Sequence, residues 1–131
     1  MSDGAWKILV AEDNAAIANV IRFTLEHAGY SVILARNGRI AWDLLQEQTY
    51  DLLLTDHQMP EMDGCQLCKL LRQDERFDDM PVVMLTAKGW ELERERLRRE
   101  LQVYELLAKP FSPRDLTATV AQALLVECPL E

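Results

Sequence analysis

Residues 50–64 read YDLLLTDHQMPEMDG, and the fold follows from this stretch. Leu52, Leu53 and Leu54 form an uninterrupted apolar run that leads to the carboxylate of Asp56. Such a run is typical of a strand buried on both faces of a parallel sheet. Sheets of this kind bind ligands at the carboxyl ends of their strands. Asp56 is therefore predicted to lie at a chemically useful edge, although an isolated Asp in this position is more often a simple loop cap.

Four more apolar runs fit strands, and helical patterns separate them. The five predicted strands are 7–11, 31–35, 50–56, 81–86 and 105–108. Predicted helices run from Asn14 to Gly29, from Gly38 through at least Leu45, over 64–73, over 90–102, and from Ser112 to about Leu125. Strands that alternate with helices indicate an α/β fold, a doubly wound five-stranded parallel sheet with helices on both faces.

Apolar residues at helical spacing predict which face of each helix is buried. The predicted buried positions are Ile17, Val20, Ile21, Leu25 and Ala28 in the first helix, Ile40, Ala41, Leu44 and Leu45 in the second, Leu67, Leu70 and Leu71 in the third, and Leu116, Val120, Ala123 and Leu124 in the last. Residues 90–102 are dense in charge, and we interpret them as a helix with a solvated face.

The length of 131 residues fits one domain, 1–131, with a core over about 6–126 and no output domain. A formal net charge of -8 argues against direct nucleic-acid binding, which needs a basic face to neutralise phosphates. No apolar run is long enough to span a membrane and no signal-peptide pattern is present, so a cytoplasmic protein without membrane association is expected. The chain has three cysteines, Cys65, Cys68 and Cys128, and an odd number does not suggest a disulfide framework. We interpret Cys65 and Cys68 as apolar helix residues rather than a redox pair.

Polar side chains follow four of the predicted strands. The first strand ends in Glu12 and Asp13, the third in Asp56, the fourth in Thr86 and the fifth in Lys109. Because parallel strands end at one edge of the sheet, these side chains are predicted to meet there. Three carboxylates offer the hard oxygen ligands that Mg²⁺ or Mn²⁺ prefers. With a hydroxyl and an ammonium added, the set fits phosphoryl chemistry in which an Asp carboxylate is the nucleophile.

Four motifs carry a resemblance to a known family. They are Glu12-Asp13-Asn14, the run TDHQMPEMDG at 55–64, Leu85-Thr86-Ala87 and Lys109-Pro110-Phe111. Together they resemble the receiver domain of two-component response regulators, which has the flavodoxin-like fold of the CheY-like receivers. The resemblance extends from Lys7 to about Leu125, and it is specific because all four motifs fall in the right order on the right elements.

The resemblance implies a phosphorylation site. Asp56 would accept a phosphoryl group from a phosphohistidine, Lys109 would pair with that group, and Thr86 would donate a hydrogen bond to it. The peptide bond between Lys109 and Pro110 is expected to be cis, as family members usually have it. Such a domain is not an enzyme in the usual sense, because it catalyses only its own phosphorylation and dephosphorylation.

The resemblance also implies a metal site at the same place. Asp13, Asp56 and the backbone carbonyl of Gln58 would ligate Mg²⁺, and Glu12 would act through a water molecule. Mn²⁺ accepts the same oxygen donors and is expected to serve as well.

A phosphorylated Asp56 carries more charge and more acceptor oxygens than the free carboxylate, so Thr86 is expected to move toward it. By resemblance, the surface that changes comprises the fourth helix, the fifth strand and the fifth helix. The family usually carries an aromatic switch residue three places before the lysine, where this chain has Leu106. Tyr104 lies two residues earlier and is expected on the same strand face, so either residue is a candidate for the switch.

The implied partners are proteins. A sensor histidine kinase or a histidine phosphotransfer protein would supply the phosphoryl group, and a downstream protein target or a missing output domain would read the state. A monomer or a phosphorylation-dependent dimer is expected. Two other functions stay open. One is a pseudo-receiver that signals without phosphorylation, and the other is a small Mg²⁺-dependent phosphohydrolase, for which the short loops leave little room.

Overall fold

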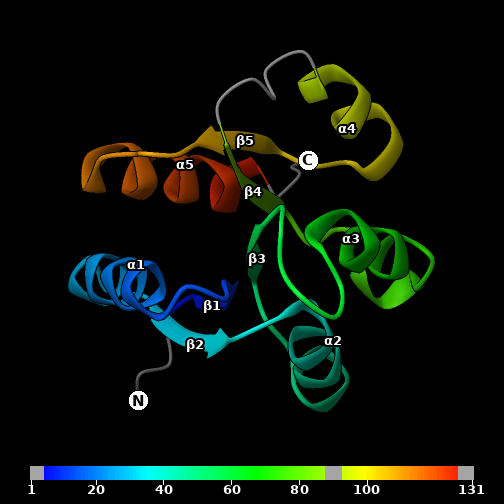
Figure 1. The fold of residues 1–131 in the computed structure, drawn as a ribbon, viewed down its shortest axis with the longest axis horizontal. Coiled ribbons are helices and arrows are strands. Elements are labelled where there is room, and N and C mark those ends of the chain that lie inside the picture. The colour runs from blue at the N-terminus through cyan, green and yellow to red at the C-terminus, as the bar shows by residue number, and fades with distance from the viewer. Residues whose placement is uncertain (1–4, 88–92, 127–131) are drawn as a thin grey trace.

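The computed structural model describes residues 5–87 and 93–126 (Figure 1). In chain order its elements are β1 (Lys7–Ala11), α1 (Ala15–His27), β2 (Ser31–Ala35), α2 (Gly38–Glu47), β3 (Leu52–Asp56), α3 (Gly64–Arg72), the 3₁₀ helix η2 (Glu75–Phe77), β4 (Val82–Thr86), α4 (Arg94–Leu101), β5 (Glu105–Ala108) and α5 (Pro113–Val126). The predicted alternation of strands and helices is confirmed. The short helix η2 is an addition that the sequence pattern does not predict.

The strands form one five-stranded parallel sheet in the order β2-β1-β3-β4-β5. Figure 1 shows α1 and α5 on one side of it and α2, α3 and α4 on the other. Strand residues alternate between the two sides: Ile8 and Leu52 pack with α1 and α5, whereas Leu9 and Leu53 pack with the other helices. The predicted doubly wound sheet with helices on both faces is confirmed. Strand order reverses between β1 and β3, the kind of place where such sheets bind ligands.

The buried stripe of α1 is narrower than its apolar spacing predicts. Ala18, Ile21 and Leu25 are buried, whereas Val20 is 56% exposed and Ala28 is also exposed. Residues at 18, 21 and 25 lie in one row toward the sheet, and position 20 lies roughly a third of a turn away from that row. None of the helices in the described residues is long and apolar enough to cross a membrane.

The buried face of α2 is also narrower than its apolar spacing predicts. The helix begins after its N-cap residue, Asn37. Gly38, Ala41 and Leu45 form its buried row, and Ile40, which was predicted to be buried, is 40% exposed. Apolar spacing therefore identifies both helices correctly but overestimates how wide their buried faces are.

The structure moves the start of β3 and describes part of the predicted helix over 90–102. β3 begins at Leu52 rather than at 50, and Asp51 before it is already bound to Lys7 of β1 through two hydrogen bonds of 2.7 Å. The predicted helix over 90–102 appears as α4, while residues 88–92 lie outside the described part of the chain. Leu97 and Leu101 are its buried residues, and its charged residues after Arg94 are exposed, as the sequence predicts.

Cys65 and Cys68 lie on α3 as free thiols. Cys68 is fully buried, and burial raises its pKa to about 12. The thiolate is the reactive form of cysteine, so such a thiol is chemically inert at neutral pH. This favours the interpretation of the pair as apolar helix residues, while Cys128 lies outside the described residues.

Candidate functional site

The carboxyl ends of β1, β3, β4 and β5 meet at one edge of the sheet. The register of β1 and β3 puts Glu12 and Asp56 next to each other, directly after paired residues on neighbouring strands. Asp56 itself pairs with Leu85, so Thr86 lies one residue beyond it on β4. The backbone N–H of Lys109 donates to the carbonyl of Thr86 at 2.8 Å. All the strand ends that the sequence predicts as a site are therefore brought together.

An acidic cluster occupies this edge. Glu12, Asp13 and Asp56 each offer a carboxylate oxygen, and these oxygens lie within 4.8 Å of one another. Glu12 and Asp56 are 2% and 7% exposed, whereas Asp13 is exposed. Like charges repel strongly where hydration is poor, and a divalent cation relieves that repulsion. Because the donors are hard oxygens with one open side, the cluster is a candidate magnesium site.

Lys109 holds the two buried carboxylates together. Its ammonium Nζ lies 3.1 Å from Oε1 of Glu12 and 3.1 Å from Oδ2 of Asp56. The remaining oxygens accept backbone donors: Oδ1 of Asp56 accepts the N–H of His57 at 2.9 Å, and Oε2 of Glu12 accepts the N–H of Asn14 at 3.1 Å. Each carboxylate is thus fixed on both sides, and the ammonium is positioned to contact a group bonded to Asp56.

Burial and charge set the protonation of this site. Burial is the main cause that raises the pKa of Glu12 above 4.5, and the charge of Asp56 adds to it against the hydrogen bonds from Asn14 and Lys109. Burial alone would lower the pKa of Lys109, but its hydrogen bonds and charge pairing with Asp56 and Glu12 outweigh burial and raise it above 10.5. Lys109 is therefore positively charged at neutral pH, and it offsets part of the negative charge of the cluster.

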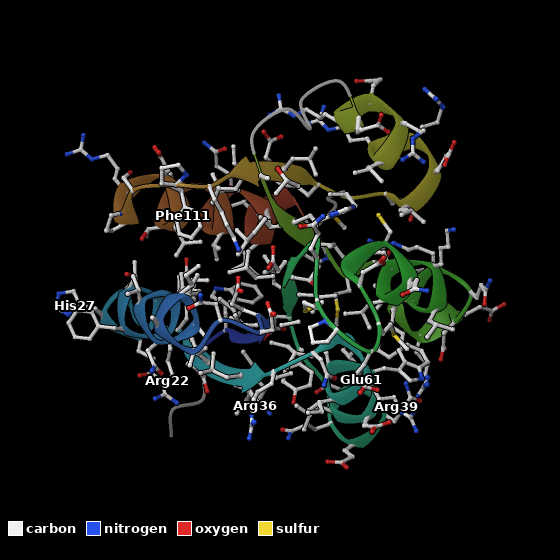
Figure 2. The ribbon with its side chains drawn as sticks, in the orientation of Figure 1. Arg22, His27, Arg36, Arg39, Glu61 and Phe111 are labelled. Carbon is white, nitrogen blue, oxygen red and sulfur yellow. The ribbon has the colours of Figure 1, made fainter. Side chains whose placement is uncertain are left out.

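Two glycines hold the loop after β3 close to the site. A side chain at Gly64 would collide with the carbonyl oxygen of Asp56, and one at Gly38 would collide with the carbonyl of Met62. Glu61 turns the loop with a φ of 70°, and Figure 2 shows it beside α2. The sequence predicts a helix that begins at Gly38 but not this contact, because the approach of two distant segments leaves no local pattern.

The remaining predicted site residues lie around the cluster. Thr86 is the last residue of β4 and is 2% exposed, and Ala87 after it is exposed. Gln58 is exposed, two residues beyond the end of β3. The peptide bond between Lys109 and Pro110 is cis, which confirms the expectation.

Leu106 and Tyr104 lie on opposite faces of the sheet, so the prediction that they share a face is wrong. Leu106 is buried in the cluster beneath α2, α3 and α4, whereas Tyr104 packs against the cluster beneath α1 and α5. β5 begins only at Glu105, so the regular alternation of a strand does not extend back to Tyr104. The two candidates for the switch therefore pack beneath different sets of helices.

The sequence and the fold match those of known proteins. Residues 8–121 match the family model of the response regulator receiver domain. The alkaline phosphatase synthesis transcriptional regulatory protein PhoP of Bacillus subtilis is 38% identical over 118 residues, which are 90% of this chain and 48% of PhoP. The chain thus spans about half the length of this curated relative.

Solved receiver structures have a similar fold. The signal receiver domain of a signal transduction histidine kinase from Syntrophus aciditrophicus is 31% identical with a TM-score of 0.86, and the match covers 97% of this chain and 96% of that one. The chemotaxis response regulator CheY4 of Vibrio cholerae is 28% identical with a TM-score of 0.84, covering 91% of this chain and 98% of that one. The chain therefore belongs to the response regulator receiver domain family of two-component signalling.

Proposed function

We propose that this receiver accepts a phosphoryl group on Asp56 and signals through the surface of α4, β5 and α5. The observation that carries the proposal is the Asp56 carboxylate, which is buried, lies 3.1 Å from the ammonium of Lys109 and belongs to the acidic cluster. A positioned carboxylate is a competent nucleophile that can form an aspartyl-phosphate. Membership of the receiver family supports the same chemistry.

In the proposed reaction an oxygen of Asp56 forms a bond to phosphorus while the bond from phosphorus to the donor's imidazole nitrogen breaks. The imidazole keeps the electron pair of the broken bond. Lys109 would contact the oxygens of the transferred group, and the hydroxyl of Thr86 would donate a hydrogen bond to one of them. A fixed charge such as that of Lys109 stabilises phosphoryl transfer without rearranging during the step.

We propose that the acidic cluster holds Mg²⁺, or Mn²⁺ in its place. Glu12, Asp13 and Asp56 supply carboxylate oxygens within 4.8 Å of one another, which suits a hard divalent cation. The carbonyl of Gln58 would be a further protein ligand, and Glu12 would act through a water molecule. When bound, the ion would offset the negative charge of the phosphoryl oxygens.

The proposed signal starts at Thr86 and reaches α4 through Leu106. The carbonyl of Thr86 accepts the N–H of Lys109, so β4 and β5 are linked at the site. Leu106 packs in the same buried cluster as Leu97 and Leu101 of α4. A displacement of β4 or β5 would therefore change the packing of α4 at Leu106, whereas Tyr104 lies beneath α1 and α5. We accordingly assign the switch contact to Leu106.

A groove beside the site fits the donor of the phosphoryl group. Its volume is about 520 Å³, and it is lined by Ala16, Ile17, Val20, Lys109, Pro110 and Phe111. Among the described residues of this lining Lys109 is the charged one, and its ammonium reaches Asp56. We propose that a sensor histidine kinase or a histidine phosphotransfer protein docks here, so that its phosphohistidine reaches Asp56. Because such kinases take phosphate from ATP, we place the reaction in the cytoplasm.

A protein target or an attached output domain would read the switched surface. PhoP is named a transcriptional regulatory protein and is about twice the length of the region matched here. We propose control by protein contact, either as a monomer or through a phosphorylation-dependent dimer.

Intact-mass spectrometry after incubation with acetyl phosphate and Mg²⁺ tests the function. We expect one phosphoryl adduct that is lost when EDTA is added first and is absent in Asp56→Ala. Asp43→Asn, which changes an exposed carboxylate of α2, is the matched control and is expected to keep the adduct.

The other outcomes would support the alternative functions. A protein that binds Mg²⁺ but forms no adduct would be a pseudo-receiver that signals by binding alone. Turnover of acetyl phosphate that persists in Asp56→Ala would instead indicate a phosphohydrolase.

A further inference from the structure

A second hollow lies at the opposite edge of the sheet from Asp56. Its volume is about 430 Å³, within the range of small-ligand pockets. Its wall includes Leu45, Glu47, Tyr50, Glu75, Phe77 and Met80. These residues come from the last turn of α2, the approach to β3, the helix η2 and the approach to β4. The pocket is therefore separate from the phosphorylation site.

Tyr50 is the chemically unusual member of this wall. The residue is only 8% exposed, and its hydroxyl is buried without a hydrogen-bond partner among the described residues. A buried hydroxyl without a partner costs free energy, so native proteins rarely leave one unpaired. Burial, and after it the negative charge of Glu47, raises the pKa of Tyr50 above 10. The hydroxyl of Tyr50 is thus under the influence of the Glu47 charge and has no hydrogen-bond partner among the described residues.

The charges around the pocket are mainly negative. Glu47, Glu75 and Asp79 belong to its lining, and none of them forms an ion pair within residues 5–87 and 93–126. Two cations lie at the pocket. The guanidinium of Arg76 belongs to the lining and lies 5.0 Å from the centre of the Phe77 ring, and the ammonium of Lys7 lies 5.6 Å from the centre of the Tyr50 ring. Both are also hydrogen-bonded. Arg76 binds Asp74 and Gln46 at 2.6 Å, and the ammonium of Lys7 binds Gln48 at 2.7 Å. The three carboxylates are left to attract a cation from outside.

We propose that this pocket binds a guanidinium or ammonium group carried on an aliphatic stem. The cationic head would lie between the carboxylate of Glu47 and the hydroxyl of Tyr50, whose oxygen would accept a hydrogen bond. The stem would pack on the apolar part of the wall, formed by Leu45, Phe77 and Met80. Such a ligand supplies the partner that Tyr50 does not have and offsets the local negative charge.

The stem and head have two sources, a free diamine-like metabolite and a lysine or arginine side chain of a partner protein. Agmatine represents the first source, and the blocked peptide acetyl-Gly-Arg-Gly-amide represents the second. N-butylurea has a similar shape to agmatine without the charge, and it serves as the neutral comparison. The proposal concerns the chemistry that both sources share.

Titration of the ¹⁵N-labelled protein, followed by NMR at low salt, tests the proposal. Agmatine or the arginine peptide is expected to saturate with a dissociation constant on the order of 1 mM, a value typical of a binding group of about ten non-hydrogen atoms such as agmatine or an arginine side chain. Amide shifts are expected around Asp51, Phe77 and Met80 rather than at Asp56. N-butylurea is expected to cause no saturable shift. Saturation by agmatine identifies a free cation, and saturation by the peptide alone identifies a partner side chain.

Two variants connect binding to the named residues. Tyr50→Phe removes only the hydroxyl, and Glu47→Gln removes only the charge; each is expected to weaken binding about tenfold. The matched control is Glu26→Gln, which removes an exposed carboxylate of α1 far from the pocket. It is expected to leave the affinity unchanged. An unchanged amide spectrum of Tyr50→Phe outside the pocket would show that the fold is intact.

Three results would overturn the proposal. They are the absence of saturable binding by either cation, equal binding of N-butylurea, and an equal loss of affinity in Glu26→Gln and Glu47→Gln. The last would mean that agmatine responds only to the overall negative charge of the protein. None of these results depends on whether Asp56 is phosphorylated.

Discussion

Two ion triads of opposite sign lie in this fold. The site triad consists of Lys109 with Glu12 and Asp56, and the helix triad consists of Glu105 with Arg94 and Arg98. Their geometry is similar, with distances of 3.1 and 3.1 Å in the first and 3.3 and 2.9 Å in the second. Their exposure differs: the site-triad side chains are 1–25% exposed, and those of the helix triad are 27–47% exposed.

The difference teaches that burial, rather than distance, decides what an ion triad does. Exposed pairs are hydrated and screened, so each contributes about 0–1 kcal/mol to stability. Buried charges lose hydration, so removing one partner leaves the others in an unfavourable setting. Only the buried triad fits the proposed role toward a cation or a phosphoryl group, whereas the helix triad joins α4 to β5.

Replacing Arg72 is expected to have the largest effect on stability, and it tests how α4 is held. Its guanidinium donates to the carbonyls of Leu101, Phe77, Met80 and Gln102 at 2.7–3.1 Å. We expect Arg72→Ala to lower the free energy of unfolding by about 3 kcal/mol, because four carbonyls lose their donor. Urea unfolding measures this loss.

Lys69→Ala is the matched control for Arg72. Lys69 is exposed on the same helix and forms no ion pair among the described residues, so a change below about 0.5 kcal/mol is expected. If both variants unfold at the same urea concentration, Arg72 does not anchor α4, and the helix triad would become the main connection.

Lys109→Met tests the buried triad itself. Without the ammonium, the carboxylates of Glu12 and Asp56 repel each other with little water between them. We expect the free energy of unfolding to fall by about 2 kcal/mol in the absence of Mg²⁺, somewhat less than for a fully buried pair because Lys109 is 25% exposed. Urea unfolding with Lys69→Met as the control measures it, and an unchanged stability would contradict the role given to burial.

Mg²⁺ provides a further contrast between the two triads. At a concentration tenfold above its dissociation constant, a ligand that binds only the folded state adds about 1.4 kcal/mol to stability. We expect this gain for the wild type and a smaller one for Asp13→Asn at the same Mg²⁺ concentration. Glu105→Gln leaves the acidic cluster intact and should keep the full gain, as thermal or urea unfolding would reveal. An equal gain in Asp13→Asn would mean that the ion binds elsewhere.

The strand ends show how much of the site is predictable from the sequence. Glu12, Asp56, Thr86 and Lys109 each follow an apolar run, and the parallel sheet brings such ends to one edge whatever the loops do. A short pattern thus specifies both the strand and the place of its last side chain. The same logic predicted the order of strands and helices and the acidic cluster.

Contacts between distant segments are beyond such patterns. The four carbonyls bound by Arg72 come from residues 5 to 30 positions away, and the collision that excludes a side chain at Gly38 involves Met62. Tyr104 was misplaced for a related reason, since alternation applies only inside a strand and β5 begins one residue later. These features depend on tertiary packing, which local spacing does not encode.

Glu105→Gln is expected to have the smallest effect, and salt makes that effect informative. Replacing Glu105 removes both pairs of the helix triad, which we expect to cost about 0.5 kcal/mol at low salt. Because screening shortens the range of exposed charges to a few ångströms, the loss should disappear near 0.5 M NaCl. The loss of stability in Lys109→Met should remain, because dissolved ions screen buried charges much less than exposed ones. Glu95→Gln, an exposed residue of α4, controls for net charge. If Glu105→Gln costs as much as Lys109→Met at every salt concentration, exposure does not separate the two triads, and α4 is held by charge after all.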